Sequence, residues 1–504
     1  MSRADKIALL LSLLAIAAAW LVADRVFERV PHLEDEIAYV WQARLMAAGE
    51  LTTATPIEPK RFLVPFVVDY EGRRFGKYPL GWPALLSVGV RLGLRDWVNP
   101  LLAGLAVWLT YRLGKKILGE ITGLVAAALT LTSPFFLMNT GSLLSHPLGL
   151  VLTLGFVLAW WDATTSPGGT DSLPRGLSTL LAGLALGAFA VTRPFSAIGV
   201  AVPFGVHGII LLVRGPAVLR RRVLAIGLLA AAVGALHYLW QFAATGDAFL
   251  NPYTLWWPYD QVGFGPGAGR AANGHTLRQA FINTNLSLYV GRHDLFGWLG
   301  WSWIFLPCGL WAIRRNGRAW LTSAVYPSLL VLYLAYWIGS WTFGPRYQFE
   351  GLFSLTLLSA AGISWLAGWP RTPGDHAVPV KGIRMARPLG VTAVVGLLVG
   401  LSLVFYVPRR LGGMSQLYGI SRSQLAPFED AGHLAPAVLI VHAGRWTEYG
   451  GLLELENPLL TSPFLFVFGG KGGLEETLRE AFPGRAVYHY YPDEPDKFYV
   501  GARK

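Results

Sequence analysis

The chain has 504 residues, of which 42 are Lys or Arg and 30 are Asp or Glu, so its formal net charge is +12. Only 14% of the residues are charged and 53% are hydrophobic, whereas about 25% are charged in an ordinary soluble domain. This composition argues against a water-soluble globule, a disordered chain and a collagen-like fibre. The single cysteine, Cys308, excludes a disulfide framework and a cysteine-based metal cluster.

The charge divides the chain into two parts. Residues 408–504 contain 10 Lys/Arg and 11 Asp/Glu, while residues 1–407 contain 32 and 19. We therefore expect a polytopic membrane domain over 1–407, with external loops at 25–79 and 245–296, and a small soluble domain over 408–504. The basic excess belongs to the membrane domain and accompanies no nucleic-acid-binding motif, so we expect no nucleic-acid partner.

Apolar runs predict an all-α membrane domain with about eleven transmembrane helices, since a span needs about 20 mostly apolar residues. The runs lie at 7–24, 97–113, 120–138, 147–162, 176–191, 195–213, 223–244, 297–313, 319–339, 351–369 and 389–407. Arg3 and Lys6 precede the first run, as in a signal peptide. The run is longer than a usual signal-peptide core, so we expect an uncleaved anchor.

Basic residues cluster in the short loops on one predicted side of the membrane. The clusters are Arg112/Lys115/Lys116, Arg214/Arg220/Arg221/Arg222, Arg314/Arg315/Arg318 and Arg371/Lys381/Arg384/Arg387. Basic loops stay in the cytoplasm. The sequence therefore predicts an integral protein of the plasma or inner membrane, with a cytoplasmic N-terminus and an extracytoplasmic domain at 408–504.

The first external loop contains an acidic pair, Asp35 and Glu36, at the start of a predicted helix. The spacing of Ile37, Val40, Trp41 and Leu45 gives this helix an apolar stripe, which is typical of a helix at a membrane interface. Acids at a helix start are favoured by the helix dipole, so one interpretation is a helix cap and the other is a functional site. Neighbouring residues point about 100° apart on a helix, so the two acids should have different roles.

Two short motifs carry a family resemblance: His32–Tyr39, with the sequence HLEDEIAY, and Gly76–Pro83, with the sequence GKYPLGWP. They resemble the first external loop of GT-C fold glycosyltransferases, and most closely the branch of protein O-mannosyltransferases and aminoarabinose transferases. The resemblance implies a GT-C fold. It also implies inverting transfer of a sugar from a polyprenyl-phosphate donor to a hydroxyl of a lipid, glycan or protein acceptor in the cell envelope.

The resemblance also implies roles for the acidic pair. Such a transfer needs a carboxylate that takes the acceptor proton and cations that stabilise the departing phosphate. By the resemblance, Asp35 is the general base and Glu36 is a supporting or metal-contacting carboxylate. Tyr39 and Tyr78 lie in the same motifs and are candidate substrate contacts.

His146 occupies a position where many relatives carry an aspartate before a Pro-Leu pair. Two interpretations stay open: His146 replaces the acid as a metal ligand or orienting group that contacts substrate, or it only starts a helix. The corresponding cofactor would be a divalent cation, Mg²⁺ or Mn²⁺, held by Asp35, Glu36 and His146.

Cations on the predicted external side are candidates for the donor phosphate, because uncompensated charge is costly in that zone. Arg346 comes first, since a guanidinium offers a planar fork to a phosphoryl group; the alternative is a structural pair with Glu350. Arg193 and Lys77 follow, and each could instead extend its charged end to the interface. Tyr347, next to Arg346, is a candidate substrate contact.

The second external loop supplies Trp257, Asp260 and His275 as further candidate substrate contacts. Its aromatic residues suit either an interfacial belt or stacking on a sugar or isoprenoid. The glycines of 263–269 lack the flanking strand and helix of a nucleotide site, so we expect a mobile lid. The pair His293–Asp294 is a candidate acceptor contact.

Residues 408–504 show strand-like runs at Ala437–Val441, Phe464–Phe468 and Arg485–Tyr491, with a helical run from Leu474 to Phe482. They predict a small α/β domain that helps to bind an acceptor or partner. Gly469–Gly473 lacks the spacing of a phosphate-binding loop and should be a turn.

A transporter or lipid flippase is the competing class, and a non-catalytic scaffold is a third. A transporter should show paired repeats and ionisable residues near the middle of the membrane. Here the predicted spans lack Asp and Glu in their interiors, and the polar candidates gather at their outer ends. A scaffold leaves the loop 25–79 unexplained, so the sequence favours chemistry at the membrane surface.

Overall fold

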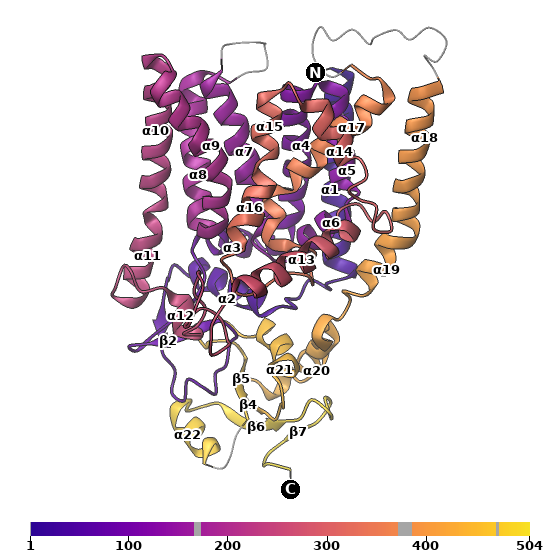
Figure 1. Ribbon diagram of the computed structural model, residues 1–504. Coiled ribbons are helices and arrows are strands. Elements are labelled where there is room, and N and C mark those ends of the chain that lie inside the picture. Colours follow the sequence, from indigo (N-terminus) through magenta and orange to yellow (C-terminus); the bar gives the residue numbers. More distant parts are fainter. Residues whose placement is uncertain (1, 166–172, 371–385, 470–472, 504) are drawn as a thin grey trace.

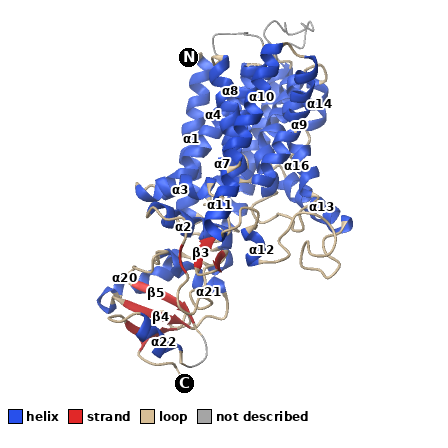
Figure 2. Cartoon of the chain, turned by 90° about the vertical axis from the view of Figure 1, so that its left-hand side faces the viewer, coloured by secondary structure: helices blue, strands red, loops and turns tan. Residues whose placement is uncertain are grey.

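The computed structural model describes residues 2–165, 173–370, 386–469 and 473–503. The chain forms a helical bundle with a small domain attached at one end, and the N-terminus lies at the other end (Figure 1). The small domain contains the larger of two sheets, and the bundle is helical throughout (Figure 2).

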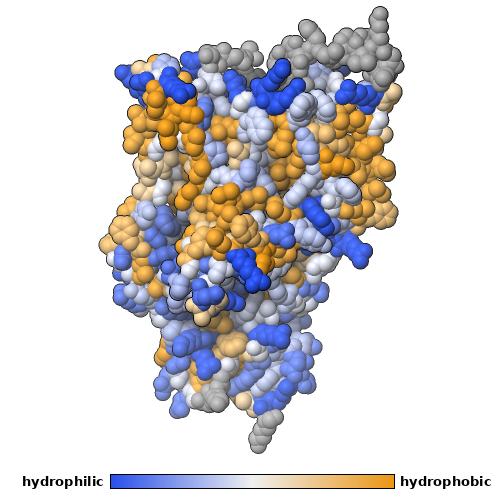
Figure 3. Space-filling view, in the orientation of Figure 1, coloured by the Kyte–Doolittle hydropathy of each residue, from blue (hydrophilic) through white to orange (hydrophobic). Residues whose placement is uncertain are grey.

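The bundle helices, in chain order, are α1 (Arg3–Arg25), α4 (Val98–Leu118), α5 (Glu120–Leu131), α6 (Pro134–Gly141), α7 (His146–Thr164), α8 (Arg175–Thr192), α9 (Pro194–Arg214), α10 (Ala217–Gly234), α11 (Leu236–Thr245), α14 (Leu306–Ile313), α15 (Gly317–Ser323), α16 (Val325–Tyr333), α17 (Leu352–Ala367) and α18 (Ala386–Leu401). On the face that Figure 3 shows, apolar side chains cover a broad band of the bundle. The chain is an integral membrane protein, as its composition predicts.

The predicted count of eleven spans is not confirmed. Among the described residues, seven helical segments are long and apolar enough to cross a membrane, or eight if α5 and α6, bent by 60°, form one span. Apolar runs over-count spans because local breakers divide them. Inside the run 120–138, Ser133 caps α6 and Pro134 stands in its first turn, and Gly297 and Gly300 adopt positive φ in the run 297–313 before α14 begins.

The predicted basic loops meet at the end that holds the N-terminus. Lys115 lies 2.8 Å from Asp5 near the start of α1, and Asn316, beside the third cluster, donates to the carbonyl of Ile117. Arg222 and Arg387 donate to carbonyls near the ends of α7 and α17 at this end of the bundle. Arg371, Lys381 and Arg384 lie outside the described residues. The membrane side that each end faces stays a prediction.

Both long loops fold between the bundle and the small domain. The first contains α2 (Glu34–Ala47), the strands β1 (Thr53–Ala54), β2 (Val67–Tyr70) and β3 (Arg73–Gly76), and then α3 (Gly81–Arg91). The strands form an antiparallel sheet in the order β1-β3-β2. The second contains α12 (Pro252–Trp256) and α13 (Leu277–Asp294).

The C-terminal region is a small α/β unit, as predicted. Its sheet has the order β5-β4-β6-β7, from β4 (Ala437–Val441), β5 (Phe464–Phe468), β6 (Ala486–Tyr490) and β7 (Phe498–Tyr499). The first three strands are parallel and β7 is antiparallel to β6. The helices are α20 (Ala426–Asp430), α21 (Trp446–Gly450) and α22 (Leu474–Ala481), and α19 (Val407–Gly412) leads into the region from α18.

Protein covers the apolar stripe of α2, mostly through this C-terminal unit, and the place of α2 at the membrane interface stays a prediction. Ile37, Trp41 and Leu45 share a buried cluster with residues such as Tyr449 and Phe466. An amphipathic pattern shows that a helix face is covered, but the pattern is the same whether lipid or protein covers it.

Ion pairs fasten the same contact. The carboxylate of Glu454 lies 2.8 Å from Arg44 of α2 and 2.6 Å from Arg95, which precedes α4. Burial alone would raise the pKa of Glu454, but the two arginines hold that pKa below its ordinary value. The C-terminal unit is therefore joined to the helix that begins with the acidic pair.

Replacing Glu454 by Ala should weaken this contact, because two partly buried arginines then lose their shared carboxylate. We expect a loss of about 3 kcal/mol in stability, measured as faster proteolysis between the bundle and the C-terminal unit and as a lower melting temperature. Glu480→Ala, an exposed change in α22, is the matched control. Equal behaviour of the two variants would contradict the fastening role.

Candidate functional site

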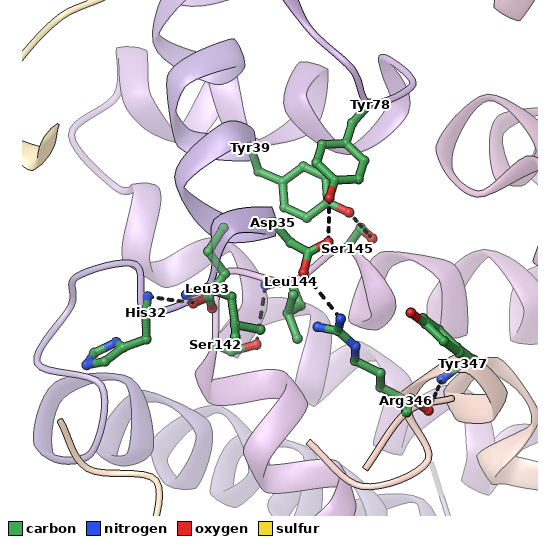
Figure 4. Close-up of polar contacts among 12 residues, drawn as sticks. His32, Leu33, Asp35, Tyr39, Tyr78, Ser142, Leu144, Ser145, Arg346 and Tyr347 are labelled. Carbon is green, nitrogen blue, oxygen red and sulfur yellow. Dashed lines mark hydrogen bonds and ion pairs between the residues drawn. The ribbon is translucent and has the colours of Figure 1, made fainter. Parts of the chain in front are cut away.

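Asp35 lies in the first turn of α2 and is held from two sides. Its Oδ2 is 3.2 Å from Nη2 of Arg346, and the hydroxyl of Tyr78 donates to its Oδ1 at 2.5 Å (Figure 4). The side chains of Asp35 and Arg346 are 22% and 19% exposed, so a ligand can reach the pair. Burial alone would raise the pKa of Asp35, but Arg346 and the Tyr78 hydrogen bond lower it below its ordinary value.

Glu36 points away from this pair and has a structural role. Its Oε2 accepts hydrogen bonds from the backbone amides of His32 and Leu33, and its Oε1 accepts one from the amide of Leu143. The side chain is buried, and both oxygens are occupied. The two acids thus have different contacts, and Glu36 fastens the start of α2 to the segment before α7. Its predicted catalytic or metal-contacting role is not supported.

Arg346 begins a short 3-10 helix (Arg346–Gly351) and pairs with Asp35, so the alternative of a structural pair between Arg346 and Glu350 is wrong. Glu350 pairs instead with Arg193, with 2.7 Å between Oε1 and Nε. His146 Nδ1 lies 3.4 Å from the same oxygen. The 3-10 geometry and the break between α8 and α9 place Arg193, not Arg346, over the buried Glu350.

Three aromatic rings surround the Asp35–Arg346 pair. Tyr39 and Tyr78 have ring centroids 4.5 Å apart, and the Tyr39 hydroxyl lies 3.2 Å from the hydroxyl of Ser145. The guanidinium of Arg346 lies 5.6 Å from the ring centroid of Tyr347. The structure thus brings together five residues that the sequence nominated, from three distant segments of the chain.

Ser145 links this group to the neighbouring buried pair. Nη1 of Arg193 donates to Ser145 Oγ at 3.1 Å, and the same hydroxyl contacts Tyr39. Arg193 therefore touches the site through Ser145, while its charge is matched by Glu350.

Lys77 and Asp260 form a second buried ion pair. Nζ of Lys77 is 3.2 Å from Oδ2 of Asp260, and both side chains are 3% exposed or less. Asp260 also accepts hydrogen bonds from Tyr336 and Trp337, at 3.1 and 3.0 Å. Burial lowers the pKa of Lys77, although Asp260 and Asp35 act in the opposite direction. Lys77 thus does not extend to the interface.

Aromatic rings enclose the Lys77 ammonium. It lies 3.7 Å from the ring centroid of Phe66 and 4.9 Å from that of Trp257. Trp257 is therefore part of a cation–π cage. This contact differs from both roles that the sequence suggested for the aromatic residues, an interfacial belt and stacking on a substrate.

His275 fixes the glycine-rich segment in place. Its ring stacks on Phe264 and its Nε2 lies 2.9 Å from the carbonyl of Leu334. The amide of Gly265 donates to the carbonyl of His275. His275 is buried and contacts backbone, so the structure gives no support to its predicted substrate contact. Motion of the segment as a lid stays a prediction.

Asp294 is used for packing. It pairs with Arg410 at 3.0 Å and accepts a hydrogen bond from Tyr406 at 2.7 Å, which ties α13 to the start of α19. A role for Asp294 in acceptor binding is not supported by these contacts.

The sequence analysis did not select Glu34, the residue before Asp35. Burial and the neighbouring Asp35 charge raise its pKa to about 6, and Lys77, Arg270 and Arg346 act against that rise. Glu34 therefore lies within the field of the same cations and titrates near neutral pH. The sequence feature that indicates Glu34 is the run of three consecutive acids, Glu34, Asp35 and Glu36.

The described residues do not form the expected metal site. They contain no group of three or more His, Cys, Asp and Glu side chains placed to hold a metal ion. Asp35 is bound to Arg346 and Tyr78, Glu36 to three amides, and His146 lies beside Arg193 and Glu350. These donors are separately engaged, so the residues do not fit a shared Mg²⁺ or Mn²⁺ ion.

Comparison with known proteins shows similarity at the level of structure. No family model and no curated sequence matches the chain. Structures of ArnT from Cupriavidus metallidurans match with a TM-score of 0.57 at 13% and 14% identity, and cover 95% and 97% of this chain and 89% and 94% of ArnT. The oligosaccharyltransferase from Archaeoglobus fulgidus matches with a TM-score of 0.51 at 12% identity, over 91% of this chain and 64% of that one.

These solved structures are GT-C glycosyltransferases. At such identities the match establishes the fold alone, and it extends over nearly the whole chain, far beyond the two motifs that carried the resemblance. The chain therefore has the GT-C fold.

Proposed function

We propose that this protein is a glycosyltransferase that moves a sugar from a polyprenyl-phosphate donor to an acceptor hydroxyl at the membrane surface, with inversion and with Asp35 as general base. The observation that carries the proposal is the partly exposed Asp35–Arg346 pair, which sets a carboxylate beside a phosphate-binding type of cation. The fold supports it, and ArnT of C. metallidurans has been solved with undecaprenyl phosphate bound.

The two groups supply what an inverting transfer needs. The acceptor hydroxyl gives its proton to Asp35 while its oxygen forms a bond to the anomeric carbon. The bond from that carbon to the phosphate oxygen breaks on the opposite face, and its electron pair leaves with the phosphate. Arg346 stabilises that charge. Its Nη2 engages Asp35, but a guanidinium has five N–H donors, so the other donors can bind the phosphate.

Arg346 also couples donor binding to the strength of the base. In the structure its charge lowers the pKa of Asp35, which keeps the carboxylate ionised but makes it a weak base. A donor phosphate that shares the guanidinium draws part of that charge away. The pKa of Asp35 then rises toward the operating pH, where general bases work best.

Lys77 and Arg193 have supporting places in this scheme. Each is a cation whose carboxylate partner, Asp260 or Glu350, is fully buried. Arg346 instead pairs with the partly exposed Asp35, so it is the better placed to bind a phosphate. We assign the donor phosphate to Arg346, and assign acceptor or sugar contacts to the nearby rings of Tyr39 and Tyr347. The acceptor is a lipid, glycan or protein; the archaeal oligosaccharyltransferase has been solved with a tethered acceptor peptide.

Asp35→Asn should lower the rate of sugar transfer by about 10²- to 10⁴-fold, because the amide cannot take the acceptor proton. The measurement is transfer of radiolabel from a polyprenyl-phosphate sugar by the full-length protein. Asp96→Asn, which alters a carboxylate paired with Arg95, controls for the loss of one charge. Retained turnover in Asp35→Asn would remove Asp35 as the base.

Arg346→Ala should raise the KM for the donor by about tenfold or more, because charge-assisted hydrogen bonds to phosphate are lost. The KM for the acceptor should change much less. Steady-state kinetics with each substrate varied in turn separates the two. Equal changes in both constants would show that Arg346 does not bind the phosphate.

Tyr78→Phe should move the acid limb of the pH–rate profile to higher pH. The lost hydrogen bond had lowered the pKa of Asp35, so the variant protonates its base at a higher pH than the wild type does. Transfer rates measured across the acidic range test this. A limb that stays in place, or moves to lower pH, contradicts the role of the hydrogen bond.

A further inference from the structure

A large cleft opens at the opposite end of the bundle from Asp35. It has a volume of about 1390 Å³ and lies between the ends of α4 and α7, one side of α9, and the segment from α14 to α16. It is therefore beside the N-terminal end of the bundle, where the basic loops meet, and none of the residues of the Asp35 site lines it.

The lining of this cleft is cationic. Lys116, Arg314, Arg315 and Arg318 line it, and no Asp or Glu is among the described residues that do so. Lys116 pairs with Asp162, but none of the three arginines forms an ion pair with a described residue. Their guanidinium groups lie on exposed side chains at the rim. Within the described part of the chain, the cleft therefore carries three positive charges that no carboxylate matches.

One wall of the cleft is apolar and continues into the surface of the bundle. Val206 and Ile210 of α9 line it and are 57% and 48% exposed. α9 is long and apolar enough to span the membrane, so these side chains face the region that lipid tails occupy. The cleft is thus open to the polar rim and also, sideways, to the bilayer.

Polar side chains close the floor between these two walls. Trp161 is buried, and its indole donates to Thr322 at 3.3 Å, which joins α7 to α15. Thr122 donates to Ser364 at 3.0 Å below the same space. The floor is satisfied internally. At the rim, Arg314 donates to the carbonyl of Trp311 and Arg318 lies over the ring of Trp161, but neither guanidinium has an acidic partner among the described residues.

We propose that this cleft binds an acidic phospholipid of the surrounding leaflet. Its phosphate would lie among Arg314, Arg315 and Arg318, and its acyl chains would follow Val206 and Ile210 along α9. A soluble anion would match the arginines but not the apolar wall, and a zwitterionic lipid would match the wall but not the net charge. Basic pockets between transmembrane helices are established places for anionic headgroups.

The test uses the full-length protein in nanodiscs of phosphatidylcholine, with phosphatidylglycerol titrated in and bound lipid counted by native mass spectrometry. The double variant Arg315→Ala/Arg318→Ala should bind phosphatidylglycerol about 30-fold more weakly, since each basic residue near an anionic lipid contributes roughly a factor of five. Arg214→Ala/Arg221→Ala removes the same charge at the same end but outside the cleft, and should bind as the wild type does.

Three results would overturn the proposal. The two double variants could lose phosphatidylglycerol binding equally, or the wild type could bind phosphatidylcholine as tightly as phosphatidylglycerol. Undecaprenyl phosphate could also displace phosphatidylglycerol when it is present at the lower concentration of the two. The last would assign the cleft to a polyprenyl phosphate. A third variant, Arg315→Lys/Arg318→Lys, keeps the charge and should retain most of the binding, so a general folding defect of the alanine variant is distinguished from loss of the site.

Discussion

The ion pair between Asp35 and Arg346 joins two segments that are 311 residues apart in the chain. Each partner is held by a regular element: Asp35 belongs to the first turn of α2, and Arg346 begins the 3-10 helix that leads into α17. The long loops and the bundle meet at this contact. A partly buried pair of this kind is costly unless other contacts hold its geometry, and Tyr78 and the surrounding rings supply those contacts.

The position of Asp35 depends on contacts made by its neighbours along α2. Glu36 fastens the helix start to the amide of Leu143, and Trp41 and Arg44 fasten its other side to the C-terminal unit. One short helix therefore uses its successive faces for the pair with Arg346, for attachment to the bundle and for attachment to the C-terminal unit. This arrangement explains why an acidic pair at adjacent positions does not act as two equivalent carboxylates.

Local patterns predicted local structure well. The strands of the C-terminal unit, the helix after Asp35 and the membrane belt each follow from residues that are close in sequence. The partners of charged residues did not follow, because Arg193 with Glu350 and Lys77 with Asp260 are set by packing between distant elements. The count of eleven spans is not confirmed. Ser133–Pro134 restarts a helix inside the run 120–138, and Gly300 adopts positive φ inside the run 297–313, because hydropathy does not register a break in the backbone hydrogen bonds.

The scarcity of charge in the membrane domain makes the distribution of unmatched charge informative. Lys77 and Arg193 are cations in low-dielectric surroundings, and each is paired with a carboxylate. Arg346 shares its charge with Asp35, the carboxylate that we propose as general base, and Arg315 and Arg318 are exposed and have no acidic partner among the described residues. Crowding cations without counter-charge is unfavourable, so an anion from outside would complete the balance at both places. We therefore propose a phosphate-bearing lipid at each end of the bundle, one that reacts beside Asp35 and one that is held in the cleft.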